Sequence, residues 1–221
     1  MTDKEYVEKL EAALAHVLQP LKGLPFTVVV RALSSQTIFP IDRESDDDRV
    51  LIAQLEKAIQ SCAEKLRSQP IQRPRPNEVG NDIEPYVMRA LVEIGYKVQR
   101  PLSKAGKGKS TGYPDIIFYD AKDRPCYLEC KIYSDDTKET SMRSFYLSPS
   151  DAFKVCMDAR HLLLSFEMVR TPINGSNLSR FSPVAFKLVD LSALDCDMKY
   201  EFNSDNRRLY NPKLVLLSGP C

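Results

Sequence analysis

The chain has 221 residues, enough for one sizeable hydrophobic core with a small additional subdomain. Hydrophobic residues make up 43% of it and charged residues 28%, which is ordinary for a soluble globular protein. The formal net charge of +1 does not indicate binding to nucleic acid, although acidic residues at a site can offset a basic surface elsewhere. The distribution of charge along the chain therefore matters more than its sum.

We expect neither a secretory signal nor a membrane-spanning segment in this sequence. Its first residues, MTDKEYVEK, are charged, and no apolar run approaches the roughly 20 residues that span a bilayer. The six cysteines are spread along the chain, without the density of a secreted disulfide scaffold. We therefore expect an intracellular, cytoplasmic protein in a reducing compartment.

The first part of the chain is predicted to be mainly helical. Leu10 and Leu14 belong to an apolar stripe at helical spacing, and residues 46–67 carry a second stripe of the same period. Between these helices, FTVVVRAL (26–33) has the composition of a buried strand. We expect these elements to form an N-terminal, mainly helical subdomain over residues 1–69.

A proline-rich segment follows the second helix. SQPIQRPRPNEVG (68–80) carries three prolines, which cannot propagate a helix and which favour a semi-rigid linker over residues 70–80. The pattern then changes to a helix near 82–95, two strands, a helix over 150–160 and a further strand. We expect residues 81–221 to form an α/β (α+β) core, with a mixed central β-sheet flanked by helices.

The stretch GYPDIIFYDAKDRPCYLECKIY (112–133) contains the two adjacent strands. Residues 115–119 are apolar on both faces, as in a covered sheet, and a polar turn connects them to CYLECKIY. In CYLECKIY the side chains alternate between two faces, so Glu129 and Lys131 share one side of the strand. Asp115, at the start of the neighbouring strand, can approach both of them.

Two carboxylates and an ammonium on one sheet face indicate a specific chemistry. Hard divalent cations such as Mg²⁺ prefer oxygen ligands, typically one or two carboxylates with waters and a substrate phosphate. Such a metal polarises a phosphoryl oxygen and lowers the pKa of bound water, and a nearby lysine can offset charge that develops in the transition state. The arrangement suits metal-assisted hydrolysis of a phosphodiester.

A plainer interpretation is that these charges decorate the solvent face of an ordinary hairpin. By composition alone, Pro-Asp followed at this distance by [DE]xK occurs by chance in on the order of a few per cent of chains. The placement of both halves on adjacent apolar strands makes such an accident rarer. We therefore favour a site.

At these residues the sequence resembles the PD-(D/E)xK nuclease superfamily and, within it, the type II restriction endonucleases. The motif covers residues 114–131. The predicted order of helix, hairpin, helix and strand over residues 82–168 is similar to the common core of the superfamily. This resemblance implies a restriction-endonuclease-like fold, a prokaryotic source and double-stranded DNA as the substrate.

The resemblance also implies roles for individual residues. Asp115 and Glu129 would bind Mg²⁺, and Lys131 would serve the attacking water. The main-chain carbonyl of Cys130 would complete the metal shell, while the side chain of Cys130 points into the core.

Glu84 is a further acidic candidate, because many superfamily members have an acidic residue on the helix before the hairpin. A competing interpretation is that residues 81–84 form a capping box, in which Glu84 only binds a backbone N–H. Pro85 supports a position in or near the first helical turn, since a later proline would break the helix. Glu93 is the alternative acid on the same helix.

Several polar segments could hold DNA. The loop SKAGKGKSTG (103–112) leads directly into the motif, and its glycines, lysines and hydroxyl groups suit contact with phosphates. The segment after the motif and two later insertions contain residue types that read base edges, although solvated loops share that composition. The candidate DNA-binding residues are Lys104, Lys107, Lys109, Ser110, Thr111, Lys138, Arg143, Asn174, Asn177, Arg180, Arg207 and Arg208.

The predicted function is Mg²⁺-dependent, sequence-specific cleavage of double-stranded DNA by a type II restriction endonuclease. A homodimer is compatible with this function, and a cognate DNA methyltransferase is implied as a functional rather than a physical partner. A Holliday-junction resolvase or a DNA-repair nuclease would share the motif, although resolvases are usually shorter chains. A catalytically silent DNA-binding module would keep the fold, but the intact Asp115, Glu129 and Lys131 argue against it.

Overall fold

The computed structural model describes residues 3–17, 19, 21–106, 108, 112–134, 145, 147–149 and 153–198. The contacts between residues divide the chain into two compact units, Met1–Leu24 with Asp195–Cys221, and Pro25–Leu194. This division does not follow the boundaries expected at the proline-rich segment. In the described part of the chain, no helix is long and apolar enough to cross a membrane.

The smaller unit contains helix α1 (Asp3–Val17), which the spacing of its leucines predicted. Strand β1 (Leu24–Pro25) pairs with strand β8 (Asp195–Cys196) in a two-stranded sheet. The N–H of Met198 donates to the carbonyl of Leu21 at 2.8 Å, which ties the two parts of this unit together.

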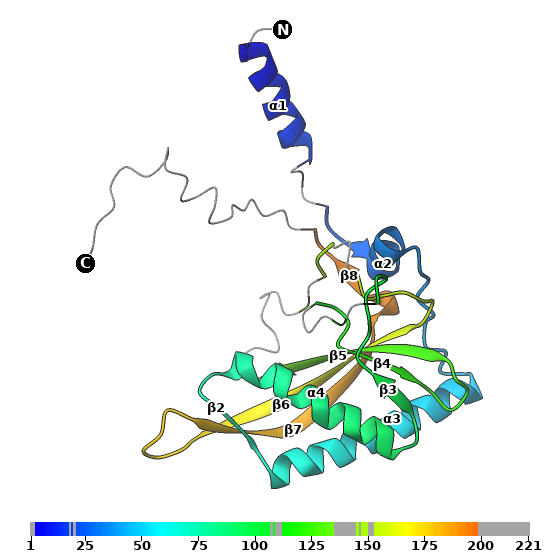
Figure 1. Ribbon diagram of the computed structural model, residues 1–221, viewed down its shortest axis with the longest axis vertical. Helices are drawn as coiled ribbons and strands as arrows, with labels where there is room; N and C mark the ends of the chain where they lie inside the picture. Colours follow the sequence, from blue (N-terminus) through cyan, green and yellow to red (C-terminus); the bar gives the residue numbers. More distant parts are fainter. Residues whose placement is uncertain are drawn as a thin grey trace. The chain divides into compact units, whose positions relative to one another are not determined.

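The larger unit is built on a six-stranded sheet with the order β2-β7-β6-β5-β4-β3 (Figure 1). Strands β5 and β6 are parallel and the other neighbouring pairs are antiparallel, so the predicted mixed sheet and α/β class are confirmed. The strands are β2 (Ile71–Arg73), β3 (Lys97–Gln99), β4 (Ile116–Tyr119), β5 (Pro125–Tyr133), β6 (Arg160–Pro172) and β7 (Ser179–Asp190).

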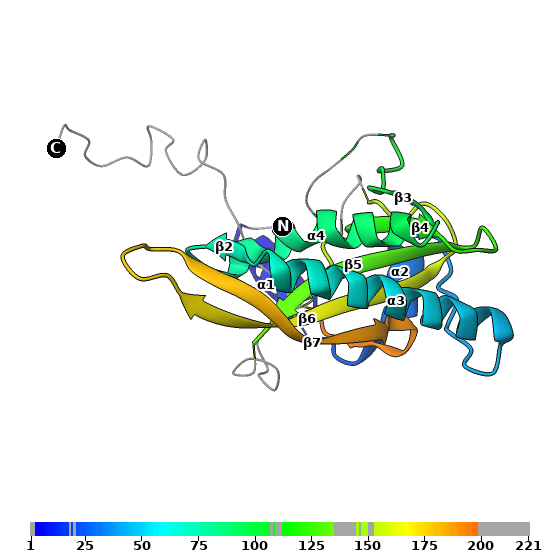
Figure 2. The ribbon, with the colours of Figure 1, turned by 90° about the horizontal axis from the view of Figure 1, so that it is seen from below.

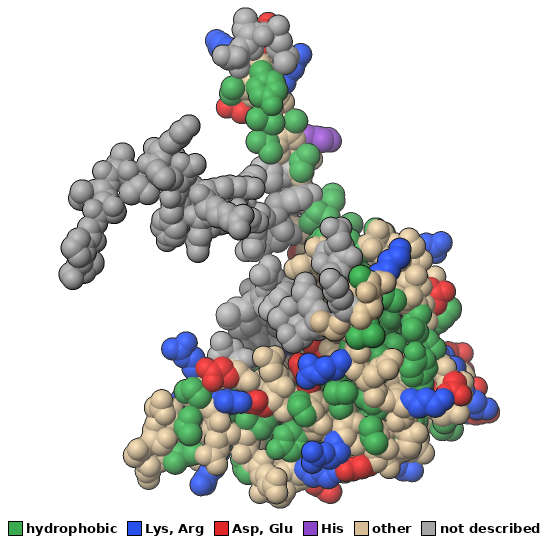
Figure 3. Space-filling view, viewed as in Figure 1, with side chains coloured by type: hydrophobic (Ala, Val, Ile, Leu, Met, Phe, Trp, Pro, Cys, Tyr) green, Lys and Arg blue, Asp and Glu red, His purple; other side chains and the backbone are tan. Residues whose placement is uncertain are grey.

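Two long helices, α3 (Asp46–Ser68) and α4 (Pro76–Glu93), lie side by side over one face of this sheet (Figure 2). The acidic first turn of α3 and the basic residues of its last turn both complement the helix dipole. Figure 3 shows Lys and Arg interspersed with Asp and Glu on the side of the molecule drawn in Figure 1. Among the described residues on that side, charges of both signs are therefore mixed.

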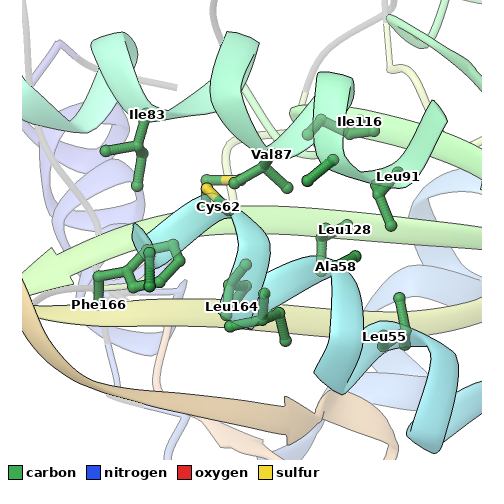
Figure 4. Close-up of a cluster of buried hydrophobic side chains, with 14 of the residues drawn as sticks. Leu55, Ala58, Cys62, Ile83, Val87, Leu91, Ile116, Leu128, Leu164 and Phe166 are labelled. Carbon is green, nitrogen blue, oxygen red and sulfur yellow. The ribbon is translucent and has the colours of Figure 1, made fainter. Parts of the chain in front are cut away.

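The main hydrophobic core lies between α3, α4 and the sheet (Figure 4). Burial of each Leu, Ile or Phe side chain there contributes about 1.5–3 kcal/mol. Because Leu128 and Cys130 of β5 face this core, the alternation along the strand turns Glu129 and Lys131 to the opposite side. The labelled core residues are Leu55, Ala58 and Cys62 of α3, Ile83, Val87 and Leu91 of α4, and Ile116, Leu128, Leu164 and Phe166 of the sheet.

The linker predicted over residues 70–80 is wrong. Ile71 is buried and pairs with Phe181, so β2 forms an edge strand of the same sheet. Pro76 is the first residue of α4, a position where the missing N–H of proline costs nothing. A three-residue edge strand is too short to show a period in the sequence, so the prolines dominated the prediction.

Helix α4 begins earlier than predicted, and Pro85 lies in its interior. An interior proline removes the hydrogen bond to the carbonyl four residues before, here Asn81, and costs about 3 kcal/mol. Ile83 and Val87 flank the proline and are buried in the core. Their burial, at about 1.5–3 kcal/mol each, is large enough to offset that cost.

Two further predictions of secondary structure are wrong. Residues 26–33 belong to helix α2 (Phe26–Ser34), in which Phe26 and Val30 are buried and Val28 is exposed, a helical period. A short apolar run does not distinguish a strand from a buried helix, which explains the error. The helix expected over 150–160 is not formed at residues 153–159, and the first three of its residues lie outside the described part.

Helix α2 packs against the other face of the sheet through an aromatic cluster. Phe26 makes edge contacts with the rings of Tyr113 and His161, and Tyr127 of β5 contacts His161 as well. The hydroxyl of Tyr113 lies 2.6 Å from Nδ1 of His161, and both side chains are buried. Burial lowers the pKa of His161 to about 3, so the imidazole is neutral and serves in packing.

The N-terminal part of α3 is held by a buried ion cluster around Asp48. Its Oδ1 accepts from Arg124 at 2.7 Å and from Arg160 at 2.8 Å, and its Oδ2 accepts from the N–H of Asp42 at 2.9 Å. Burial alone would raise the pKa of Asp48, but the hydrogen bonds from Asp42 and the two arginines outweigh it and hold the pKa below the usual value. The cluster ties α3 to the β4–β5 turn and to the start of β6.

We predict that Asp48→Asn lowers the free energy of unfolding by about 3 kcal/mol at pH 7, because it removes the anion that pairs with Arg160 and one of the two that pair with Arg124. The folded-state pKa of Asp48 lies below the unfolded value, so its contribution is complete above the unfolded pKa and is lost as pH falls through the folded one. The difference between wild type and variant should therefore shrink below about pH 4. Urea unfolding between pH 3 and 7 measures it.

Asp47→Asn is the matched control, since Asp47 lies in the same turn but is half-exposed beside Lys122. This control should change stability by less than about 0.5 kcal/mol. Equal stability of the two variants would contradict a stabilising role for the Asp48 cluster.

Candidate active site

The register of β4 against β5 places Asp115 and Glu129 together. Ile116 pairs with Leu128, and continuation of this antiparallel register by one residue sets Asp115 opposite Glu129. Oδ2 of Asp115 accepts a hydrogen bond from the N–H of Cys130 at 2.9 Å. Asp115, which precedes β4, is therefore anchored directly to β5.

Glu129 is buried and only partly satisfied. Its Oε1 binds Nζ of Lys131 at 2.7 Å, while its Oε2 is buried without a hydrogen-bond partner among the described residues. Burial, together with the negative charge of Asp115, raises the pKa of Glu129 to about 7, and Lys131 opposes this rise only in part. A buried carboxylate with a free oxygen beside a second carboxylate is arranged for a cation.

Glu84 joins these residues from α4. It is the ninth residue of the helix, so the alternative of a capping box at residues 81–84 is wrong. Burial and the charge of Asp115 raise the pKa of Glu84, whereas Arg100, at 3.2 Å, lowers it. Glu93, the alternative acid, pairs with Lys65 of α3 at the other end of the helix.

Two basic residues that lie at this site were not identified from the sequence. Arg100 pairs with Glu84, and Lys154 is buried where Asp115, Glu129 and Glu84 all act on it electrostatically. Both lie outside the motif in segments without regular secondary structure. No sequence pattern could have identified them, because only the tertiary structure brings these segments to the hairpin.

The donor set matches a hard divalent cation. In the described residues, no group of three His, Cys, Asp or Glu side chains is close enough to hold a metal by itself. Mg²⁺ usually binds through one or two carboxylates, with waters and substrate oxygens completing the shell. Asp115 and Glu129, with the free Oε2 of Glu129, fit that mode, whereas a closed site for zinc would require more protein ligands.

The half of the sheet beyond the aromatic cluster has a polar face opposite α3 and α4. By register, Lys131 lies beside Ser165 of β6, which lies beside Lys187 of β7. Further along the same face, Thr171 pairs with Arg180. We call this surface the open sheet face, and Lys187, Thr171 and Arg180 are exposed on it.

The predicted DNA-binding residues are scattered in the structure. Lys104 is exposed in a turn near Leu102, which bridges to Gly108. Asn174 and Asn177 lie in the turn between β6 and β7, which projects from the body of the unit (Figures 1 and 2). At about 3.3 Å per residue, β6 ends at Pro172 about 23 Å from the level of Lys131, and Asn174 lies beyond that end. Outside the described residues lie Lys107, Lys109, Ser110, Thr111, Lys138, Arg143, Arg207 and Arg208.

Comparison with known proteins shows the family of this chain. Residues 12–213 match the family model described as the Type II restriction enzyme MjaV family. The chain is 38% identical over 232 residues to the "Type II restriction enzyme MjaV" of Methanocaldococcus jannaschii, with 98% of this chain and 97% of that protein covered. No solved structure gives a significant match.

Both matches confirm the function expected from the sequence, and they favour neither a junction resolvase nor a silent DNA-binding module. The chain belongs to the MjaV family of type II restriction enzymes and is a site-specific endodeoxyribonuclease.

Proposed function

We propose that this endonuclease uses Mg²⁺ held by Asp115 and Glu129 to cleave double-stranded DNA, with Lys131 and Glu84 as further active-site residues. The observation that carries the proposal is the buried Glu129 carboxylate, with one oxygen on Lys131 and the other without a partner among the described residues. Leaving a buried anion partly unsatisfied costs stability, so its position is explained by a cation that the folded chain receives. The main-chain carbonyl of Cys130 is proposed as a third protein ligand.

When bound, the metal would act as a Lewis acid on the phosphate and promote deprotonation of the attacking water. Hydrolysis joins the oxygen of that water to phosphorus while one P–O bond of the backbone breaks and the leaving oxygen takes up a proton. Negative charge therefore grows on the phosphate oxygens. Lys131, fixed by Glu129 at 2.7 Å, is positioned to orient the water and offset this charge.

Glu84 is proposed to act next to the metal rather than as a primary ligand. Its pairing with Arg100 already occupies one carboxylate oxygen, and the pair lies on α4 and the loop after β3. A carboxylate held in this way can bind a water of the metal shell through its other oxygen. Glu84 would then fix the position of that water.

DNA is proposed to lie on the open sheet face, with its scissile phosphate at the metal site. Neighbouring strands are about 4.8 Å apart, so Lys187 lies two strands, or about 10 Å, from Lys131. Lys187 also lies over the ring of Tyr133, with Nζ 5.1 Å from the centroid. Lys187 and Arg180 can contact phosphates or base edges, while Lys104 and Asn174 lie in turns that could reach neighbouring parts of the duplex.

We further propose an oligomeric state, a functional partner and a cellular location for the enzyme. A duplex with a two-fold symmetric site would be cut most simply by a homodimer. A cognate methyltransferase would protect the same sites in the host. We place the protein in the cytoplasm, where its DNA substrate and Mg²⁺ are found.

We predict that the wild-type protein with Mg²⁺ cuts long unmethylated duplex DNA into discrete fragments, and that a chelator stops the reaction. Asp115→Asn and Glu129→Gln should each slow cleavage at least about 10³-fold, because the metal supplies several kcal/mol of transition-state stabilisation. Their DNA affinity in gel shifts should stay near that of wild type. Asp123→Asn, in the exposed turn that pairs with Lys97, is the control. Wild-type turnover in either active-site variant would contradict the metal assignment.

We predict that Lys131→Ala lowers the single-turnover rate about 10²–10⁴-fold, the usual contribution of a positioned proton-transfer or charge-stabilising group. Lys131→Arg should not restore the rate, since a guanidinium has another shape and does not deprotonate. Thermal melting should change little, because the Lys131 side chain is partly exposed and Glu129, whose pKa is already raised to about 7, can take up a proton when the ammonium is lost. Near-normal cleavage by a folded Lys131→Ala protein would rule out the proposed role.

We predict that Lys187→Ala and Arg180→Ala weaken DNA binding and make the plot of log K against log salt shallower. The slope should fall by about 0.9 for each phosphate that the variant protein no longer neutralises. Lys57→Ala is the control, since Lys57 is exposed on α3 at the opposite face of the sheet. Equal slopes for Lys57→Ala and the two open-face variants would indicate that DNA binds to another surface of the protein.

A further inference from the structure

Lys154 is a second lysine at the candidate active site. It comes from the segment between β5 and β6, and only 4% of its surface is exposed. Its neighbours Phe153 and Val155 are buried as well. An ammonium is rarely buried to this degree without a reason in its surroundings.

The position of Lys154 is fixed by contacts of the following residues. The N–H of Cys156 donates to the hydroxyl of Tyr127 at 3.0 Å, which holds the segment against β5. Two residues further on, the carboxylate of Asp158 accepts from the N–H of Thr37 at 2.6 Å. The segment has no regular secondary structure, so these tertiary contacts determine where the lysine lies.

The surroundings of Lys154 are the carboxylates of the site. Burial lowers the pKa of Lys154, while Asp115, Glu129 and Glu84 act to raise it and Arg100 acts to lower it. Lys131 and Arg100 have direct partners, at 2.7 Å on Glu129 and at 3.2 Å on Glu84. Tyr127, which holds this segment through Cys156, lies two residues before Glu129 on the same face of β5, so the segment with Lys154 approaches the side of the sheet that carries these acids.

The balance of charges at the site shows what Lys154 adds. Three acidic and three basic groups meet here, so with all of them ionised the site is neutral before any metal binds: Glu84, Asp115, Glu129, Arg100, Lys131 and Lys154. One divalent cation would make the site positive by two charges. A phosphodiester brings one negative charge, and a further one develops as the water attacks. With the metal and the reacting phosphate both bound, the three basic groups bring the total charge of the site to zero.

We propose that Lys154 is a second catalytic lysine, which contacts the scissile phosphate and offsets the negative charge that grows on it. This inference rests on the proposed function of the site. It differs from a purely structural role, in which Lys154 would only keep the three carboxylates together until a metal replaced it.

The two roles predict opposite effects of Lys154→Met, a neutral variant of similar size. A phosphate-binding lysine opposes the metal electrostatically, so its removal should leave Ca²⁺ affinity without DNA unchanged or tighter. Single-turnover cleavage at saturating Mg²⁺ should fall about 10²–10³-fold, as when one charge-stabilising donor is removed. DNA affinity in Ca²⁺ should fall less than the rate does, because the contact strengthens in the transition state.

Lys154→Arg should recover part of the cleavage rate, because it keeps the charge although its shape differs. It also tests the proposal if Lys154→Met does not fold, since a folded arginine variant that binds Ca²⁺ more weakly and regains the wild-type rate in extra Mg²⁺ would show that the residue only supports the metal site. Lys57→Met, on the outer side of α3, is the control for removal of a lysine.

The outcomes separate this inference from the proposed function. A normal cleavage rate in Lys154→Met would overturn the assignment of Lys154 alone. Weaker Ca²⁺ binding, with a rate that extra Mg²⁺ restores, would show that the residue only supports the metal site. A wild-type protein that cuts no DNA with Mg²⁺ would overturn the proposed function and the role of Lys154 together.

Discussion

The antiparallel pairing of β4 with β5 is the constraint on which the candidate active site depends. Its register sets Asp115 beside Glu129 and buries Leu128 and Cys130 in the core beneath α3 and α4. Because side chains alternate along a strand, a register shift by one residue would turn Glu129 into that core. The same hydrogen bonds therefore determine both hydrophobic packing and the placement of the charged groups. The site is as precise as the core that supports it.

Two buried carboxylates, Asp48 and Glu129, have contrasting surroundings. Both oxygens of Asp48 accept hydrogen bonds, and the arginines around it contribute to a pKa below the usual value. Glu129 keeps one oxygen without a described partner and lies next to Asp115, and its pKa is raised to about 7. A buried carboxylate with a pKa raised in this way costs stability, and such groups are concentrated at functional sites. The fold offsets the cost through well-satisfied clusters and a continuous core elsewhere.

The two faces of the sheet differ in the side chains and elements that lie on them. One face is covered by α3 and α4, which bury apolar side chains from β4, β5 and β6. The opposite side of the sheet has the aromatic cluster around His161 at one end. At its other end lies the polar surface with Lys187 that we call the open sheet face. The candidate metal site lies on the strand between them, since Glu129 follows Tyr127 on the same side of β5. The helical layer thus supports the sheet from one side, while Lys187 is exposed on the other.

The sequence by itself determined the elements whose signal is local. Alternation in the hairpin and the spacing of Asp115, Glu129 and Lys131 predicted the strands, their faces and the resemblance to type II restriction endonucleases. It could not show that residues 71–73 close the sheet or that Pro85 lies inside α4, because long-range packing outweighs local preference there. Lys154 likewise could not be identified from the sequence, since its place beside the carboxylates depends on contacts between residues far apart in the chain. Local patterns set the chemistry of the hairpin, and only tertiary structure decided which distant charges surround it.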